Sequence, residues 1–409
     1  MIVGGDVRTS TSFLKEALVK GLMECGAHLI DIGTVPTPVF YFAKGFLKAD
    51  GGITVTASHN PAKYNGFKVI LGDMPIRTED IQTIKKIVEQ RSYQVGIGSY
   101  RNLEVNELYQ EYTRGLVRTY KPLKVIIDAG NGATSILAPQ LFKKIGYEVI
   151  PLFCEFDGNF PNRELNPAVY SNLEKLQTKV LDEEADLGIG FDGDGDRVVF
   201  VDEKGRISTS EESFTVFIQD YLKDHPAPVI YDIKSSSIIK KEIEKHGGKA
   251  IMERSGHAFI KKTFLENQGI LAGEISGHFF FKELGYDDGI YAALKMAEIL
   301  SKNNQLLSYY IDKIDKTFMT PDLRIPYPKE LQIELLTKLE NLGRRYKIVR
   351  LDGIRIEFPR GWALMRQSVT KPCVTIRFEA DSEADLHFIK KEFLETVPEL
   401  RGKHDHLLI

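Results

Sequence analysis

Three aspartates alternate with glycines immediately before an arginine, in the order Asp192, Asp194, Asp196 and Arg197. Carboxylates this close together repel one another unless a cation neutralises them, and the glycines let the backbone bend so that the oxygens converge. Oxygen ligands of this kind favour magnesium, manganese or calcium. Because a metal and a guanidinium together suit a phosphoryl group, the segment predicts a site for phosphate chemistry.

Two other interpretations of this acidic segment remain open. An EF-hand calcium loop would place a glycine where Arg197 stands and would continue into a helix. Here the next residues, VVFVD, are typical of a strand. A solvated acidic turn is the second alternative.

Ser58 lies in TASHNP, after the apolar stretch ITVT. A hydrolase pair with His59 is disfavoured, because neighbours in an extended chain point opposite ways and no G-x-S-x-G turn surrounds the serine. A serine on a loop that faces a metal site could instead carry a phosphoryl group. A plain loop serine beside the Pro61 turn is the alternative. Lys68, in the strand that leaves this loop, is a candidate to stay near the phosphoryl group.

Polar residues alternate with glycine and isoleucine in the later segment GEISGH, where Glu274, Ser276 and His278 stand. In an extended chain these three share a face, and they suit hydrogen bonds to hydroxyl groups. A cap or turn is the alternative interpretation. Lys234 and His257 also follow strands, but each is a weak signal alone.

A last polar cluster lies in RQSVTKP, between two apolar stretches near the C-terminus. Arg366, Ser368 and Thr370 occupy alternate positions and can form an anion site with one charge and two hydroxyls. A β-turn with a solvated arginine is the alternative.

The elements that must position these residues form a threefold repeat. Strand, loop, helix, glycine and strand follow one another from Met1, from Leu123 and from Pro228. The predicted helices cover residues 13–25, the stretch ending at Ile145, and the stretch ending at His246. Apolar strands alternating with helices predict mostly parallel sheets with helical cover.

Each repeat continues into another short strand and a polar loop, and these loops hold the serine, the aspartates and GEISGH. Ligand sites in such sheets form at the carboxyl ends of strands, so the three loops are expected to converge on one cleft. The C-terminal part differs: helices are predicted at 329–341 and 383–396, with closely spaced strands between them. Tight turns between strands predict an antiparallel sheet.

The predicted fold class is therefore α/β, with three consecutive similar α/β domains and a C-terminal α+β domain around a central cleft. The first three domains have mixed, mostly parallel sheets, and the fourth has an antiparallel sheet. The expected bounds of the four domains are 1–104, 105–206, 207–318 and 319–409.

Composition excludes several classes of protein. The 409 residues are 43% hydrophobic and 27% charged, with a formal net charge of -3, which are globular values without a bias toward nucleic acid or anionic membranes. Cys25, Cys154 and Cys373 are isolated, so neither a zinc site nor a disulfide framework is predicted. The start, MIVGGDVRTS, lacks the pattern of a signal peptide, and no apolar run is long enough for a membrane span. We therefore expect a cytoplasmic location.

Taken together, TASHNP, DGDGDR, GEISGH and RQSVTKP resemble the α-D-phosphohexomutase superfamily, in particular its bacterial phosphomannomutase/phosphoglucomutase branch. The likeness covers nearly the whole chain and extends to DGNFPN, GHAFIKK, FFKELGYDDGIY and IRFEAD. It implies an isomerase that interconverts hexose 1-phosphate and hexose 6-phosphate, of mannose or glucose, through a phosphoserine enzyme. Hexose 1,6-bisphosphate would be both intermediate and activator.

The resemblance also implies a role for each candidate residue. Ser58 would be the phosphoserine, and its phosphate would bind one Mg²⁺ together with Asp192, Asp194 and Asp196. Lys68 and Arg197 would lie beside the transferred phosphoryl group, and Lys68 is expected to be a general base with a depressed pKa. The implied substrate-binding residues are His59, Asn60, Lys234, His257, Glu274, Ser276, His278, Arg366, Ser368 and Thr370. The last three of these would hold the phosphate that is not transferred.

Alternatives to this function remain open. A phosphoglucosamine mutase is the nearest, followed by an impaired homologue that binds phosphosugars without turnover, and by a phosphatase. The expected partner is a small phosphosugar, without nucleic acid or membrane, and the expected assembly is a monomer or weak homodimer.

The sequence departs from the family pattern at two places. Met1 opens at the family's second strand, and Gly5 replaces its usual arginine, so the first domain is expected to lack an edge element and a substrate-contacting loop. Such a loss would expose apolar surface and lower activity. In the phosphate loop, Val369 and Lys371 replace more typical residues.

Overall fold

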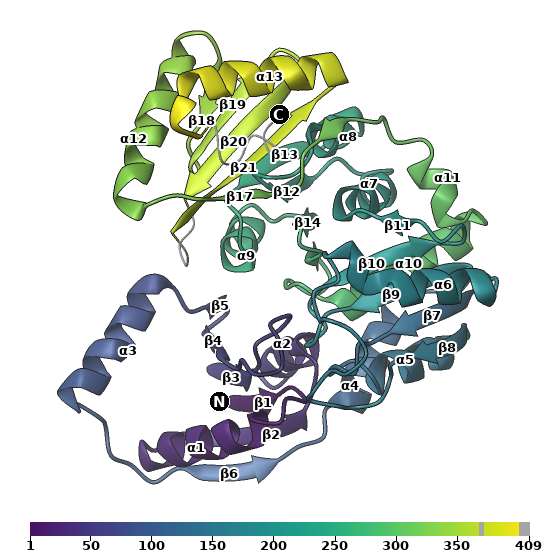
Figure 1. Ribbon diagram of the computed structural model, residues 1–409. Helices are drawn as coiled ribbons and strands as arrows, with labels where there is room; N and C mark the ends of the chain where they lie inside the picture. Colours follow the sequence, from purple (N-terminus) through teal and green to yellow (C-terminus); the bar gives the residue numbers. More distant parts are fainter. Residues whose placement is uncertain (368–371, 401–409) are drawn as a thin grey trace.

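The computed structural model describes residues 1–367 and 372–400. Four sheets, each with its own helices, follow one another along an arc, and we call them domains I to IV (Figure 1). No helix among the described residues is long and apolar enough to cross a membrane.

Domain I contains a six-stranded sheet with the strand order β5-β4-β3-β1-β2-β6. Its elements are β1 (Ile2–Gly5), α1 (Thr11–Glu24), β2 (His28–Thr34), α2 (Thr37–Phe46), β3 (Gly51–Val55), β4 (Phe67–Leu71), β5 (Met74–Pro75), α3 (Thr78–Gln90) and β6 (Ser99–Asn102).

Domain II contains a five-stranded sheet with the order β11-β10-β9-β7-β8. Its elements are α4 (Asn106–Gly115), β7 (Lys124–Asp128), α5 (Leu137–Ile145), β8 (Glu148–Leu152), the 3-10 helix η1 (Tyr170–Leu173), α6 (Glu174–Asp182), β9 (Leu187–Phe191), β10 (Val198–Asp202) and β11 (Ile207–Ser208).

Domain III contains a four-stranded sheet with the order β13-β12-β14-β15. Its elements are α7 (Ser210–Tyr221), β12 (Pro228–Asp232), α8 (Ser237–Lys245), β13 (Lys249–Glu253), α9 (His257–Glu266), β14 (Leu271–Gly273), β15 (Phe279–Phe281), α10 (Gly289–Asn303) and α11 (Leu307–Ile311).

Domain IV contains an antiparallel sheet with the order β16-β21-β20-β19-β18, and β17 also pairs with β21. Its elements are β16 (Phe318–Met319), β17 (Leu323–Pro326), α12 (Lys329–Glu340), η2 (Asn341–Arg344), β18 (Lys347–Val349), β19 (Ile354–Phe358), β20 (Gly361–Gln367), β21 (Cys373–Ala380), α13 (Glu383–Thr396) and η3 (Pro398–Leu400).

The predicted repeat is present as one strand arrangement in three copies. In domains I to III the first strand lies between the second and the third, in parallel, as in β3-β1-β2, β9-β7-β8 and β14-β12-β13. A fourth strand, β4, β10 or β15, returns antiparallel beside the third. The loops between third and fourth strands, residues 56–66, 192–197 and 274–278, carry the serine, the aspartates and the GEISGH residues.

Buried apolar side chains connect the first three domains, whereas the fourth domain has a core of its own. One apolar core runs through domains I, II and III and includes Phe40, Phe142 and Phe279, whereas a second core fills domain IV beneath α12 and α13. The junction between domains III and IV is built around the buried carboxylate of Glu379, which accepts hydrogen bonds from the Ser236 hydroxyl and the Trp362 indole. These contacts attach domain IV to the start of α8.

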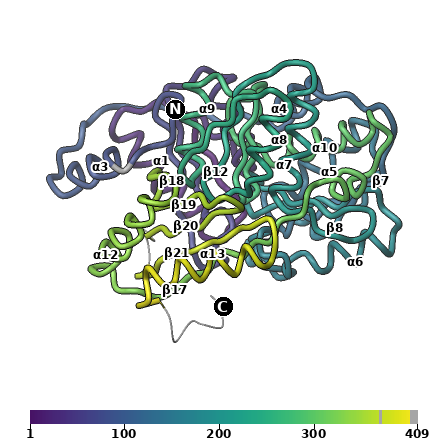
Figure 2. The backbone as a smooth tube through the Cα atoms, turned by 90° about the horizontal axis from the view of Figure 1, so that it is seen from above, coloured from purple at the N-terminus to yellow at the C-terminus, as the bar shows by residue number. Residues whose placement is uncertain are grey.

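The expected loss of an edge element from domain I stays a prediction. β1 is hydrogen-bonded on both sides, to β2 and to β3, so it is an inner strand and the sheet edges are β5 and β6. Exposed apolar side chains of this domain occur on α3, where Ile81 is 51% exposed and Val88 is 55% exposed. α3 projects from the rest of the chain in both views (Figures 1 and 2).

Candidate active site

Backbone contacts bring the three loops together at the carboxyl ends of their strands. The carbonyl oxygen of Ser58 faces the Cα of Gly193, where an added Cβ would lie 2.6 Å from it. The N–H of Val198 donates to the Gly277 carbonyl at 3.1 Å, which connects the aspartate loop to the GEISGH loop. The expected convergence of the three loops is therefore present.

Ser58 is held against the first aspartate of the triplet. Its hydroxyl, which is buried, donates a 2.7 Å hydrogen bond to Asp192 Oδ2, and its backbone N–H donates to Thr56 Oγ1 at 2.9 Å. The backbone of Ser58 is left-handed, with φ 49°, a conformation that non-glycine residues adopt rarely. This distortion brings the Ser58 hydroxyl to 3.4 Å from His59 Nδ1, a contact that an extended chain would not allow.

Arg8 holds the serine loop in place, although it was not among the site residues predicted from the sequence. Its buried guanidinium donates to the carbonyl oxygens of Ser58, Asn60, Pro61 and Tyr64, at 2.6 to 2.9 Å. The same guanidinium pairs with Asp6 at 3.0 Å. The missed signal is the spacing of Asp6 and Arg8, two opposite charges directly after an apolar strand.

The other two aspartates are paired with cationic and hydroxyl donors. Asp194 Oδ2 accepts from Thr37 at 2.6 Å and from Lys68 Nζ at 2.7 Å, and Lys68 also donates to Asp196 Oδ2. Burial opposes the charge of Lys68, but the carboxylates of Asp194 and Asp196 outweigh it and raise the Lys68 pKa well above its usual value. In this arrangement Lys68 acts as a counter-charge to Asp194 and Asp196, and its role as a general base stays a prediction.

The aspartate triplet fits a divalent cation. Asp192, Asp194 and Asp196 are fully or almost fully buried, and one oxygen of each lies within 4.8 Å of the others. Asp194 Oδ1 and Asp196 Oδ1 accept no hydrogen bond from any residue that the structure describes. Burial, and then the charges of Asp194 and Asp196, raise the pKa of Asp192 well above its usual value. Buried oxygens without donors and excess negative charge are what a magnesium site provides.

Arg197 belongs to a chain of contacts that reaches into domain III. Its Nε donates to His278 Nε2 at 2.9 Å, and His278 Nδ1 lies 2.7 Å from Asp287 Oδ2. The ring of His257 stacks on His278 with centroids 5.7 Å apart. Burial lowers the pKa of His257 to about 4, so that its ring is neutral at pH 7. The predicted residues Arg197, His257 and His278 are thus brought together.

Glu274 and Ser276 form the polar part of the GEISGH loop. The Ser276 hydroxyl donates to Glu274 Oε2 at 2.9 Å, while Glu274 Oε1 is buried and has no hydrogen-bond partner in the described part of the chain. Burial raises the pKa of Glu274. A buried carboxylate oxygen with no donor is an acceptor for a ligand hydroxyl.

The remaining candidates lie at the domain III–IV side. Lys234 pairs with Asp322 at 3.1 Å, and Arg366 pairs with Asp352 at 2.9 Å, while Arg366 Nε has no partner among the described residues. Ser368 and Thr370, together with Val369 and Lys371, lie outside the described residues.

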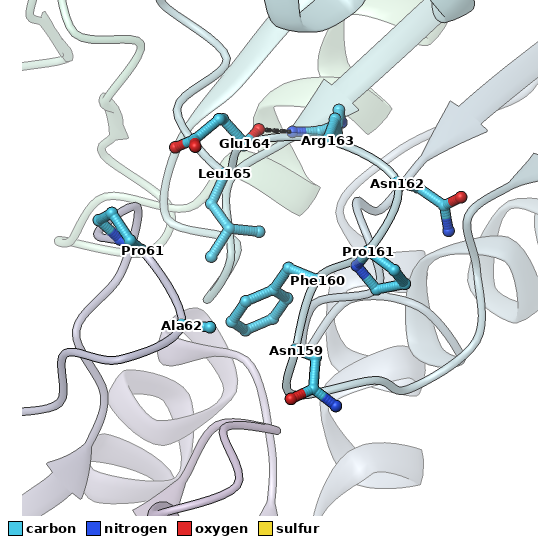
Figure 3. A pocket seen from close by; sticks show the side chains of 9 residues that line it. All are labelled: Pro61, Ala62, Asn159, Phe160, Pro161, Asn162, Arg163, Glu164 and Leu165. Atoms are coloured by element: carbon cyan, nitrogen blue, oxygen red, sulfur yellow. Dashed lines mark hydrogen bonds between the residues drawn. The ribbon is translucent and has the colours of Figure 1, made fainter.

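A cavity of about 290 Å³ lies beside the serine loop, between Pro61–Ala62 and residues 159–165. Figure 3 shows the side chains of Phe160 and Leu165 directed toward Ala62. Arg8 also lies over the Phe160 ring, 5.1 Å from its centroid. The DGNFPN segment of domain II therefore supports the loop that carries Ser58.

Four family models match the chain in succession, and together they cover most of it. Their descriptions are phosphoglucomutase/phosphomannomutase alpha/beta/alpha domain I at residues 1–95, domain II at 107–205, domain III at 209–317, and the C-terminal domain at 326–396.

Curated relatives and a solved structure agree with these matches. A phosphomannomutase/phosphoglucomutase of Pseudomonas putida is 40% identical, over 98% of this chain and 88% of its own length. A phosphoglucomutase of Neisseria gonorrhoeae is 39% identical, over 97% of this chain and 89% of its own. The crystal structure of a phosphoglucomutase/phosphomannomutase family protein from Burkholderia thailandensis superposes with a TM-score of 0.91 at 35% identity, covering 98% of this chain and 89% of that one.

Proposed function

This chain belongs to the phosphoglucomutase/phosphomannomutase family, and we propose that it is a mutase that interconverts the 1-phosphates and 6-phosphates of mannose and glucose. The observation that supports this most directly is the 2.7 Å hydrogen bond from the Ser58 hydroxyl to Asp192, in a site with two further aspartates and Arg197. A serine in that position can accept and return a phosphoryl group.

Ser58 is the proposed phosphoryl carrier. In the forward step the bond between Ser58 Oγ and phosphorus breaks, a bond forms between phosphorus and the free hydroxyl oxygen of the sugar phosphate, and the proton of that hydroxyl ends on Ser58 Oγ. The product is a hexose 1,6-bisphosphate. After the bisphosphate turns over, its other phosphoryl group returns to Ser58 Oγ, so that the enzyme is regenerated and the phosphate has changed position.

Charge on the moving phosphoryl group is the main obstacle to this reaction. Asp192, Asp194 and Asp196 would hold Mg²⁺, which supplies positive charge to the phosphoryl oxygens. Arg197 contributes a guanidinium that is directed by His278, and Lys68 offsets the charge of two of the aspartates. The left-handed backbone of Ser58 and its support by Arg8 keep the hydroxyl in one place.

Binding of the sugar and of the second phosphate is assigned to domains III and IV. Glu274 and Ser276 accept and donate hydrogen bonds to sugar hydroxyls, with His59, Asn60, His257 and His278 around them. Arg366, with Ser368 and Thr370, holds the phosphate that is not transferred, and Lys234 lies nearby in domain III. This phosphate site lies in a different domain from Ser58. It can therefore release one phosphate of the bisphosphate and bind the other without loss of the intermediate.

The test is a product assay with magnesium, a trace of glucose 1,6-bisphosphate, and mannose, glucose or glucosamine 1-phosphate. We expect 6-phosphates of mannose and glucose. Exclusive conversion of glucosamine 1-phosphate would show the alternative, a phosphoglucosamine mutase. Release of free phosphate would show a phosphatase, and binding of sugar phosphate without product would show an impaired homologue.

A further inference from the structure

A cavity of about 250 Å³ lies where domains I and III meet. Domain I contributes Tyr41, Lys44, Ile70 and Asp73 to its wall, and domain III contributes Lys261, Leu265, Leu284 and Tyr286. Among the described residues that line it, none is a proposed catalytic or substrate-binding residue. The cavity is therefore a separate compartment that is shared by two domains of the active site.

Lys261 is the unusual residue of this cavity. It is only 6% exposed, yet no hydrogen bond or ion pair joins its ammonium group to any described residue. The other buried lysine, Lys295, is paired with Glu298. The Lys261 ammonium lies over the Tyr41 ring, 5.3 Å from its centroid, and burial lowers its pKa. Its ammonium nitrogen keeps some solvent contact but has no direct counter-charge in the described chain, and an anion in the cavity can supply one.

Tyr286 forms part of the cavity wall with its ring. The ring packs edge-on against Tyr41 with centroids 5.6 Å apart. Its hydroxyl is buried, with no hydrogen-bond partner among the described residues, and is therefore out of reach of a ligand in the cavity.

The remaining charges leave the cavity positive. Lys44 on the opposite wall pairs with Asp73, whose side chain is 86% exposed. The carboxylate of Asp287 also acts on Lys261 from the active-site side, and it is already committed to His278. Two ammonium groups thus face one rim carboxylate, while Ile70, Leu265 and Leu284 form apolar walls.

We propose that this cavity binds a small organic acid, with its anionic group between Lys44 and Lys261 and with its apolar part against Leu265 and Leu284. The acidic group is a carboxylate or a phosphate ester, since both present oxygens to ammonium donors. The site is distinct from the phosphosugar site around Ser58 and Arg366.

A ligand in this site would affect how domains I and III are arranged relative to each other. Lys261 lies one turn into α9, the helix that begins at His257, and Lys44 lies in α2 of domain I. An anion between them adds a charged bridge from domain I to domain III, which together surround the substrate. The ligand is therefore an effector, whose binding stabilises one arrangement of the two domains.

Amine labelling tests the site without relying on activity. The protein is treated with limiting acetic anhydride, with sulfate or benzoate as the probe, and acetylation of Lys261 is read by peptide mass spectrometry. We expect about tenfold slower acetylation of Lys261 at saturating probe, and a lower midpoint for benzoate than for sulfate. Lys262, the exposed neighbour on the same helix, is the internal control and should be acetylated at an unchanged rate.

Variants decide whether protection arises in this cavity. Lys44→Gln should raise the protecting concentration about tenfold, as expected for loss of one hydrogen bond to a charged group. Arg366→Ala, which removes the proposed phosphate contact of the active site, should leave protection unchanged. Equal acetylation of Lys261 with and without probe would overturn the site, and so would loss of protection in Arg366→Ala. Equal midpoints for sulfate and benzoate would overturn the assignment to an organic acid.

Discussion

The guanidinium of Arg8 donates a 2.7 Å hydrogen bond to the backbone carbonyl of Ser58, fifty residues later in the chain. Three further carbonyls of the same loop accept from Arg8, and the guanidinium is buried with its partner Asp6. The loop that carries the proposed nucleophile is thus held by an arginine at the end of the first strand.

Replacing Arg8 is expected to damage both stability and catalysis. Arg8→Ala leaves the buried Asp6 carboxylate without its counter-charge, which costs about 3–5 kcal/mol of unfolding free energy. Arg8→Lys keeps the charge but cannot reach four carbonyls and Asp6 at once, so its loss in stability should be smaller while turnover still falls. Urea unfolding and initial rates measure the two effects. If Arg8→Ala unfolds at the same midpoint as the exposed control Arg101→Ala, the structural role of Arg8 is refuted.

Ser58→Ala should abolish phosphorylation of the protein and lower turnover by several orders of magnitude. The reason is that the methyl group cannot carry a phosphoryl group and no other hydroxyl donates to Asp192 in the described site. Phosphopeptide mapping after incubation with glucose 1,6-bisphosphate, together with the mutase assay, provides the measurement. Ser92→Ala, at an exposed serine, is the control. Retained activity in Ser58→Ala would disprove the phosphoserine mechanism.

Magnesium should stabilise the wild-type protein and fail to stabilise Asp194→Asn. A ligand that binds only the folded state adds about 2.7 kcal/mol at a hundredfold excess over its Kd. Asp194 offers a buried oxygen without a donor to the metal, and its replacement removes one negative charge from the triplet. Differential scanning fluorimetry with and without magnesium measures the shift. Asp224→Asn, at an exposed position, should behave as the wild type, and a full magnesium shift in Asp194→Asn would contradict the metal assignment.

Arg366→Ala should raise the KM for sugar phosphates more than it slows the reaction of the phosphoenzyme with water. Arg366 is assigned to the phosphate that does not react, so its contact contributes equally to ground-state and transition-state binding. The exposed Arg360→Ala in the same domain is the matched control. An unchanged KM in Arg366→Ala would remove the residue from the substrate site.

Stability should fall between pH 7 and pH 5, in part because of His257. Its pKa is lowered to about 4 by burial, against about 6.5 in an unfolded chain. As the pH falls below 6.5, the unfolded state takes up a proton before the folded state does, so the stability is complete above that pH and is lost toward pH 4. Between pH 7 and pH 5 the wild type should lose about 1–2 kcal/mol more than His257→Gln. Urea midpoints at the two pH values measure this, and equal losses in both proteins would refute it. His28→Gln, at an exposed histidine, should retain the full pH dependence.

Much of this molecule could be predicted from its sequence because the relevant signals are local. The helix predicted at 383–396 is observed as α13 (Glu383–Thr396), and the side chain of Ser382 caps its start by accepting from the Asp385 N–H. The helix predicted to end at Ile145 does end there, before Gly146 in a left-handed conformation. The threefold strand–helix–strand repeat placed the loops of Ser58, Asp192 and Glu274 at strand ends, where the structure brings them together.

Tertiary structure decided what depends on partners far away in the chain. Arg8 could not be linked to Ser58, because the acceptors are carbonyl oxygens, which every residue possesses and no sequence pattern marks. The charge state of Lys68 follows from two carboxylates more than a hundred residues later, which outweigh the effect of burial. Lys261 and Tyr41 belong to different domains, so their shared cavity exists only once both domains have packed. Sequence periodicity thus specified the elements and the loops, whereas the electrostatics of the site arose from side chains that only the folded chain brings within a few ångströms of one another.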